Sequence, residues 1–378
     1  IMKIVMAIDS FKGSLSSMDA GRAAAEGIQR VDPKVQVKVR PLADGGEGTV
    51  EALTEGMGGR FCKVSVMGPF GEPVDCEYGI LDETKTAIVE MSGAAGITLV
   101  PRERLNPLEA TTYGVGEVIK DAIGQGCRRF IVGIGGSATN DGGVGMLQAL
   151  GYDFLDEDGE QIGKGAAALE KLRKISTEHV LPELAECEFH IACDVTNPLC
   201  GERGCSAVFG PQKGATPQMI EKMDQWLGEY AKMTQEVFPK ADAQYPGTGA
   251  AGGLGFAFLA YTPAVLESGI EIVLKELKLE EDIKEADLVI TGEGRLDEQT
   301  AMGKVPVGVA SLAKKYQKPV IAFSGSVTPG ARLCNEKGID AYFPILRSIV
   351  TLDEAMERER AWNNMADTAE QAYRLFQI

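Results

Sequence analysis

The chain has 378 residues, enough for two domains of ordinary size, and a hydrophobic content of 44% can supply large cores. It contains 55 acidic and 38 basic residues and has a formal net charge of −17 at pH 7. This acidity argues against nucleic acid or an anionic membrane as a partner, because phosphate groups attract surfaces rich in Lys and Arg.

The N-terminal part predicts a strand–helix–strand unit. Residues 3–9 (KIVMAID) and 35–43 (VQVKVRPLA) are apolar runs typical of buried strands, and each passes into a polar loop that contains glycine. Between them, Ser16 and Asp19 have the spacing of a capping box, and apolar residues recur from there to Val31. A second helix is predicted after the second strand.

The middle of the chain predicts a second α/β region. Strand-like runs pass directly into polar loops at residues 87–96 (AIVEMSGAAG), 129–143 (RFIVGIGGSATNDGG) and 189–198 (FHIACDVTNP). Strands that alternate with helices favour parallel pairing with right-handed crossovers.

The C-terminal part returns to the pattern of the first 45 residues. Three strands are predicted at residues 286–294, 318–325 and 341–346, separated by helices, one of which has Pro306 in its first turn. We therefore expect an α/β fold in which a flavodoxin-like, doubly wound parallel domain, 1–61 plus 281–378, is interrupted by an inserted α/β domain, 62–280. In a flavodoxin-like order the first and third strands are neighbours at the switch point, where ligands bind.

The loop 133–145 (GIGGSATNDGGVG) follows a predicted strand and is rich in glycine. Such loops let backbone N–H groups approach phosphate oxygens, and we expect Gly135, Gly136 and Ser137 to meet the phosphates of a nucleotide. Gly133, Gly135 and Ala138 also fit the loose dinucleotide fingerprint. The alternative is that these glycines serve tight turns and close helix contacts. The chain has no Walker-type G-x-x-x-x-G-K-[ST] loop and lacks the protein-kinase motifs.

Charged residues on loops at predicted strand ends are candidates for the chemistry. We expect Lys12, Arg295 and Lys304 to hold anionic groups, with Lys12 and Arg295 at the reacting centre and Lys304 at the nucleotide. Neither of the two histidines is well placed as a base, so a carboxylate should accept the hydroxyl proton, with Asp194 as first choice. Asp141 and Asp297 are then candidates for Mg²⁺, although an aspartate in such a loop could equally cap a helix.

Several of these motifs resemble those of the bacterial glycerate kinase family, of the glycerate 2-kinase type. They are DSFKGSLS (9–16), ADGGEGTVEA (43–52), GIGGSATNDGG (133–143), ACDVTNPLCG (192–201), FGPQKGA (209–215), GAAGGLG (249–255), VITGEGRLDEQT (289–300) and GKVPVGVA (303–310). The resemblance runs in order from Met2 to the C-terminus. It implies phosphorylation of D-glycerate, with 2-phosphoglycerate as the expected product, and ATP and Mg²⁺ as cofactors. It also implies that the inserted domain has a restriction-endonuclease-like fold.

Two other functions remain as alternatives at this stage. An NAD-dependent dehydrogenase of a small hydroxy acid would use the Gly133 fingerprint, but Asp153 and Asp156, about 20 residues on, lie in a turn-like context rather than on a strand. A non-catalytic protein that binds a small ligand is the second alternative. The eight scattered cysteines and the lack of a long apolar run favour reduced thiols, a cytoplasmic location and no membrane span.

Overall fold

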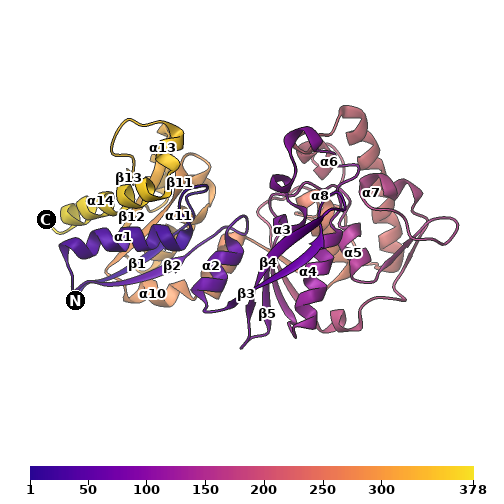
Figure 1. The fold of residues 1–378 in the computed structure, drawn as a ribbon, viewed down its shortest axis with the longest axis horizontal. Helices are drawn as coiled ribbons and strands as arrows, with labels where there is room; N and C mark the ends of the chain where they lie inside the picture. Colours follow the sequence, from indigo (N-terminus) through magenta and orange to yellow (C-terminus); the bar gives the residue numbers. More distant parts are fainter. The chain divides into compact units, whose positions relative to one another are not determined.

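The computed structural model describes residues 1–378 and divides into two compact units (Figure 1). Unit 1 contains residues 1–44, 51–57 and 270–378, and unit 2 contains residues 45–50 and 58–269. Unit 1 is thus built from both ends of the chain. The sequence-based boundaries differ in three short segments, because residues 45–50 and 58–61 belong to unit 2 and residues 270–280 belong to unit 1.

The sheet of unit 1 has five parallel strands in the spatial order β13–β12–β11–β1–β2. Their bounds are Lys3–Ile8 (β1), Gln36–Pro41 (β2), Leu288–Leu296 (β11), Val320–Val327 (β12) and Ala341–Pro344 (β13). β1 pairs with β11, so that Ile4 lies opposite Leu288, which confirms the prediction that strands from the two ends of the chain share one sheet. Because all five strands are parallel, the loops that follow them emerge at one edge.

Helices cover both faces of this sheet. Ile4, Met6 and Ile8 of β1 share a core with α1 (Ser17–Val31) and α14 (Arg358–Phe376), which pack against each other (Figure 1). The alternate residues Val5 and Ala7 are also buried and point to the other face, where α10 (Leu279–Glu285) and α11 (Val305–Lys315) contact β1. The remaining helices associated with this unit are short: α2 (Thr49–Gly56), α9 (Gly269–Glu276), α12 (Leu333–Glu336) and α13 (Leu352–Met356).

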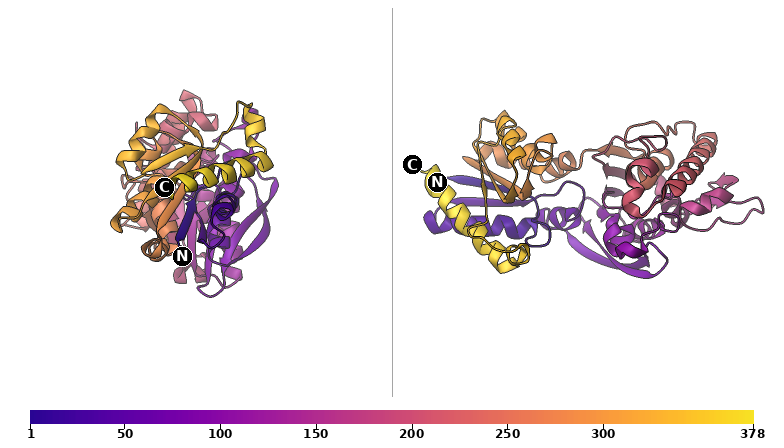
Figure 2. Two further views of the ribbon diagram at one scale, coloured as in Figure 1. Left: turned by 90° about the vertical axis from the view of Figure 1, so that its left-hand side faces the viewer. Right: turned by 90° about the horizontal axis from the view of Figure 1, so that it is seen from above.

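Local signals in the sequence act as expected in unit 1. The side chain of Ser16 accepts a hydrogen bond from the Asp19 backbone N–H and caps α1, and Pro306 lies in the first turn of α11. The two chain termini lie side by side on this unit in every view (Figures 1 and 2), and the Tyr373 hydroxyl is 3.2 Å from the Met2 sulfur.

The main sheet of unit 2 has six strands in the order β10–β9–β6–β5–β4–β3. The strands β5 (Thr86–Glu90), β6 (Arg129–Gly133), β9 (Glu188–Ala192) and β10 (Val265–Glu267) are parallel, whereas β3 (Arg60–Met67) and β4 (Pro73–Leu81) extend the sheet in antiparallel fashion. β7 (Asp153–Leu155) and β8 (Lys174–Ser176) form a separate small sheet. Both units are therefore α/β.

The helices of unit 2 are α3 (Ser92–Ala95), α4 (Tyr113–Gly124), α5 (Val144–Ala149), α6 (Cys205–Phe209), α7 (Pro217–Val237) and α8 (Ala250–Tyr261). α4 packs against α5, and α6 packs against α7 and α8. All eight cysteines of the chain are free thiols. None of the helices combines the length and apolar character that crossing a membrane requires.

Candidate active site

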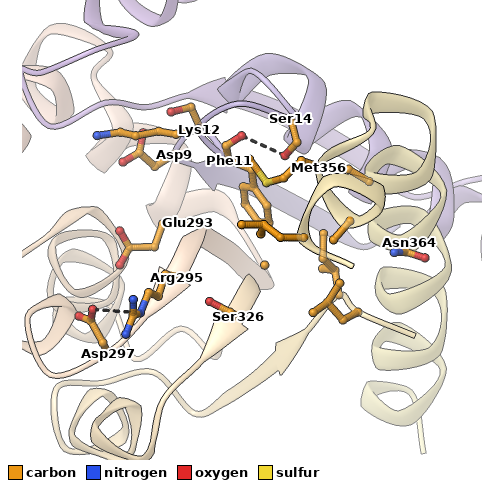
Figure 3. Close-up of a pocket in the computed structure, with 18 of the residues that line it drawn as sticks. Asp9, Phe11, Lys12, Ser14, Glu293, Arg295, Asp297, Ser326, Met356 and Asn364 are labelled. Atoms are coloured by element: carbon orange, nitrogen blue, oxygen red, sulfur yellow. Dashed lines mark hydrogen bonds and ion pairs between the residues drawn. The ribbon is translucent and has the colours of Figure 1, made fainter. Parts of the chain in front are cut away.

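A pocket of about 370 Å³ lies in unit 1, at the edge of the sheet where the parallel strands end (Figure 3). Its walls come from the loop after β1, the end of β11, the end of β12 and the segment from Ile345 to Asn364. Doubly wound sheets bind ligands beyond the carboxyl ends of their strands, at the point where the strand order reverses. β1 and β11 are neighbours at that point in unit 1.

Two buried carboxyl groups lie in this pocket. The pKa of Asp9 is raised to about 7, chiefly by burial and also by the nearby charges of Asp44 and Glu293, against the opposing effects of the Ser10 N–H and Lys12. Asp9 is 7% exposed, and its Oδ1 accepts a hydrogen bond of 2.6 Å from the Ser10 N–H. Burial also raises the pKa of Glu293, whose Oε1 accepts a hydrogen bond from the Thr300 hydroxyl. The pocket thus holds carboxyl groups that keep their protons to higher pH than exposed carboxyl groups do.

The three basic residues predicted for the site line the same pocket. Lys12 follows β1 and is exposed, and Arg295 lies near the end of β11 with its side chain 65% exposed. Lys304 is the N-cap residue of α11, and no side chain caps the first N–H groups of that helix. Lysine, arginine and the free N–H groups of a helix N-terminus all favour anions. The arrangement can therefore bind carboxylate or phosphate groups.

Asp297 joins these residues in the pocket. Its Oδ1 accepts hydrogen bonds from the backbone N–H groups of Gln299 and Thr300, at 2.9 and 3.1 Å, and so fixes the turn after β11. Its Oδ2 lies 3.6 Å from Nε of Arg295 (Figure 3). One oxygen is therefore occupied by the backbone, and the other faces a partly exposed cation.

The donor groups of the pocket fit a magnesium ion only as it is commonly held beside a nucleotide. No group of three or more His, Cys, Asp or Glu side chains is close enough to form a cage for a metal. Mg²⁺ usually keeps several waters and binds one or two carboxylates together with phosphate oxygens. Oδ2 of Asp297 can supply one such ligand.

In unit 2, the glycine-rich loop after β6 has a buried base and an exposed tip. At Gly133 a Cβ atom would lie 2.1 Å from the Gly45 carbonyl oxygen, so only glycine permits this close approach. Gly135 and Gly136 are exposed, and a Cβ atom at either position would meet no atom closer than 3.7 Å. Gly136 has a φ of +75°, which disfavours a side chain even where there is space. The tip therefore leaves its backbone accessible.

A buried lysine that the sequence analysis did not single out holds this loop. Nζ of Lys213 donates hydrogen bonds to Oγ of Ser137 at 2.8 Å and to the Thr139 carbonyl oxygen at 2.6 Å. Lys213 is 1% exposed, and burial lowers its pKa to about 8. It lies in the run FGPQKGA (209–215), where neither periodicity nor a metal or catalytic spacing marks it. Only the folded chain brings it to residues 137–139.

Asp141, which the sequence predicts as a magnesium ligand, is buried among hydrogen-bond donors. It is 1% exposed, and its two oxygens accept hydrogen bonds from Thr112, through both N–H and hydroxyl, and from the N–H groups of Gly143 and Gly145. Thr112 is the N-cap residue of α4, and Gly143 and Gly145 lie at the start of α5. The carboxylate ties two helix N-termini together and has no oxygen left for a metal.

Asp194 lies beyond the end of β9, and its side chain is exposed. β9 is the parallel neighbour of β6, so Asp194 and the loop from Gly135 to Ser137 lie at the same edge of the sheet. Oδ1 of Asp194 accepts a hydrogen bond of 3.0 Å from the Gly269 N–H, which orients the carboxylate.

The two histidines are engaged elsewhere. His190 forms hydrogen bonds with Glu267 and Glu188 through its two ring nitrogens, and His179 forms one with Asp153. Each ring is therefore already paired with carboxylates inside unit 2.

Residues 247–252 also have the glycine spacing G-x-G-x-x-G, and here the glycines serve packing. A Cβ atom at Gly249 would lie 2.1 Å from the Pro198 carbonyl oxygen, and one at Gly252 would lie 2.1 Å from that of Thr139. Ala251, Gly252 and Gly253 all have positive φ within α8. These residues let the irregular start of α8 pack directly behind the loop that contains Asp141.

Comparison with known proteins gives a consistent result over the whole length. A family model described as "Glycerate kinase family" matches residues 4–377. The chain is 48% identical to a protein named glycerate 2-kinase from Escherichia coli (strain K12), covering 97% of this chain and 98% of the relative. It is 46% identical to a glycerate kinase from Halalkalibacterium halodurans, covering 96% and 97%. A crystal structure from Salmonella typhimurium LT2, provisionally named glycerate kinase 2, matches with a TM-score of 0.91 and 45% identity, covering 100% of this chain and 98% of that one.

Proposed function

Because this chain belongs to the glycerate kinase family, we propose that it transfers the γ-phosphoryl group of ATP to a hydroxyl group of D-glycerate, with 2-phosphoglycerate as the product. The observation that supports this most directly is the pocket of unit 1, where Lys12, Arg295 and Lys304 gather beside buried carboxyl groups. Phosphoryl transfer needs little covalent participation by the protein. It needs positioned anions, neutralised charge and a carboxylate near the acceptor hydroxyl.

We assign the anionic groups to these cations. The planar guanidinium of Arg295 suits the carboxylate of glycerate, because it can donate two parallel hydrogen bonds. Lys12 neutralises charge on the transferred group as a point charge, and Lys304 binds the nucleotide phosphates together with the uncapped N-terminus of α11.

We assign the loop tip of unit 2 to the nucleotide phosphates as well. The backbone of Gly135 and Gly136 is accessible, and Oγ of Ser137 is held in place by Lys213. Lys213 acts through Ser137 and is therefore a positioning residue. The motif differs from a Walker-type loop because its lysine comes from another part of the chain and is buried.

We propose that Oδ2 of Asp297 holds Mg²⁺ together with phosphate oxygens. When bound, the ion neutralises charge on the phosphates of ATP. Asp297 itself contributes a fixed position, since its Oδ1 is held by two backbone N–H groups.

For the base that accepts the hydroxyl proton of glycerate we propose Asp194, an exposed and oriented carboxylate at a strand end. Asp9 is a second candidate, because a carboxyl group with a pKa of about 7 is matched to proton transfer near neutral pH. Replacing the base by its amide should lower kcat about 10²- to 10⁴-fold without rescue by Mg²⁺. Comparing Asp194→Asn with Asp9→Asn separates the two assignments.

The test of the function is release of ADP that depends on added glycerate, with the product identified by its phosphorus NMR spectrum. We expect release with ATP and D-glycerate, and phosphate on O2. Arg295→Lys should raise KM for glycerate or lower kcat, because the fork geometry is lost. Absence of glycerate-dependent ADP release from the folded wild-type protein would overturn the proposal, and reduction of NAD in the presence of glycerate would support the dehydrogenase instead.

We also propose the finer fold descriptions. Counted within unit 1, the strand order is 2-1-3-4-5 with all strands parallel, which supports a flavodoxin-like domain. For unit 2 we propose a restriction-endonuclease-like domain, with the mixed sheet of antiparallel β3 and β4 beside four parallel strands as support.

A further inference from the structure

The pocket of unit 1 has two chemically different halves. Its charged half contains Asp9, Lys12, Glu293, Arg295 and Asp297. Its other half is apolar and is built from Phe11 and from the segment that follows β13, including Leu352, Ala355 and Met356. Figure 3 shows the charged side chains on one side, Phe11 in the middle, and Met356 and Asn364 on the other side.

Glycerate does not fit the apolar half of the pocket. Each of its three carbon atoms carries oxygen, so every part of the molecule prefers polar partners, and burying it against Phe11 and Met356 would leave its hydroxyl groups without hydrogen bonds. The charged half already offers what a small hydroxy acid needs. The apolar half therefore fits a larger ligand that is anionic at one end and flat and apolar at the other.

We infer that the apolar half binds the purine base of the nucleotide, between Phe11 and α13, and that Asn364 on α14 recognises the edge of the base. This inference rests on the proposed function, which supplies the nucleotide. Lys12 and Lys304, the pocket cations assigned to phosphate groups, complement a triphosphate, so the pocket matches both ends of one nucleotide. Asn364 lines the wall, and its carboxamide offers both a donor and an acceptor for ring nitrogens and exocyclic groups.

The neighbouring asparagine provides a control. Asn363 precedes Asn364 on α14, is exposed and does not line the pocket. Truncating Asn364 removes the hydrogen bonds that distinguish adenine from guanine, whereas truncating Asn363 removes an exposed side chain of the same kind. We expect Asn364→Ala to reduce the preference for ATP over GTP about tenfold, measured as the ratio of kcat/KM values, and Asn363→Ala to leave it unchanged.

A second pair of variants tests whether the base occupies the apolar half. Ala355→Trp fills that half, and Asp353→Trp places the same side chain at an exposed position of α13 outside the pocket. By calorimetric titration without glycerate, we expect Ala355→Trp to weaken ATP binding about tenfold or more and to leave the affinity for inorganic triphosphate unchanged. Asp353→Trp should bind both ligands as the wild type does.

The calorimetric titrations do not depend on turnover, so failure of the inference is distinguishable from failure of the proposed function. Unchanged ATP affinity in Ala355→Trp overturns the inference, and so does equal weakening of ATP and inorganic triphosphate. A selective rise in KM for glycerate in Ala355→Trp, with ATP unaffected, also overturns it. If the wild type binds ATP as described but releases no ADP with glycerate, the base site stands and the proposed acceptor is wrong.

Discussion

Asp9 shows, at the scale of a single residue, how a ligand pocket opposes folding. Its pKa is raised from 3.8 to about 7, chiefly by burial, so the folded protein binds more protons than the unfolded chain between these values. Stability therefore falls as the pH rises through this window, and the full penalty is present above about pH 7. The groups that face Asp9 are Asp44, Glu293 and Lys12, so two of the three are acidic.

Replacing Asp9 by asparagine should stabilise unit 1 at pH 8. The gain has an upper bound of about 4 kcal/mol and should vanish near pH 3, where the carboxyl group is protonated in both states. The chain has two tryptophans, Trp226 in unit 2 and Trp362 in unit 1, so urea unfolding in a Trp226→Phe background reports on unit 1. Asp75→Asn, at an exposed position in unit 2, serves as the control. A variant no more stable than its parent at pH 8 would contradict this account.

Asp141 and Asp297 should respond differently to magnesium. Asp141→Asn replaces a buried acceptor of several hydrogen bonds, so we expect a loss of stability of about 1.5–3 kcal/mol or more and no recovery of activity at high Mg²⁺. Asp297→Asn should lose activity that added Mg²⁺ partly restores, because it weakens a metal ligand. Thermal unfolding and the Mg²⁺ dependence of kcat for both variants decide the matter. Recovery of activity by the Asp141 variant at high Mg²⁺ would indicate that Asp141 is a magnesium ligand after all.

At the scale of the element, α8 illustrates what a run of small residues permits. Residues 251–253 have positive φ, and at Gly252 and Gly253 the chain passes so close to residues 139–142 that a side chain cannot fit. The irregular turn therefore supports the loop that carries Asp141 from behind. The glycines of the sequence GAAGGLG (249–255) make close contacts with neighbouring backbone.

Gly252→Ala should destabilise the protein more than Gly58→Ala. Both glycines have φ above +60°, so each substitution carries the backbone strain of about 1–2 kcal/mol. At Gly252 the new Cβ would also lie 2.1 Å from the Thr139 carbonyl oxygen, whereas at Gly58 nothing lies within 4 Å. The difference in Tm between the two variants measures the destabilisation that comes from the steric clash alone. Equal shifts in Tm would show that the close packing behind the loop does not add to the destabilisation.

At the scale of the whole molecule, the two units differ in which parts of the chain they need in order to fold. Unit 2 is contained within residues 45–269, whereas unit 1 needs residues from both ends, since β1 pairs between β2 and β11. The two partners of β1 are thus separated by more than 240 residues of sequence. Formation of unit 1 must wait for a contact that closes a long loop, which is slow.

Residues 45–269 expressed alone should therefore fold. We expect a cooperative thermal transition and a near-ultraviolet circular dichroism signal from Trp226, because this segment contains all strands of both sheets of unit 2 and its own core. The matching fragment 1–57 lacks β11 to β13 and should not fold. A fragment 45–269 without fixed tertiary structure would show that unit 2 requires the rest of the chain.

The sequence by itself determined the parallel strands of unit 1, their division between the two ends of the chain, the cap at Ser16 and the family. It also placed four residues at the edge of the sheet where the parallel strands end: Lys12, Arg295, Asp297 and Lys304. The reason is that loops at the carboxyl ends of parallel strands emerge at the same edge of a sheet. These features are local or follow from the alternation of strands and helices, so periodicity and loop composition reveal them.

Tertiary structure alone decided the rest. Lys213 forms a hydrogen bond with Ser137, from which it is separated by 76 positions in the sequence. Asp141 accepts a hydrogen bond from the hydroxyl of Thr112, 29 positions away. The apolar half of the pocket combines Phe11 with α13 and α14 from the other end of the chain. No local pattern marks such partners, because burial, hydrogen bonding and the resulting pKa of a side chain depend on which distant backbone segments pack around it. The same aspartate in a glycine-rich loop can bind a metal or tie two helices together, and only the donors that surround it distinguish the two roles.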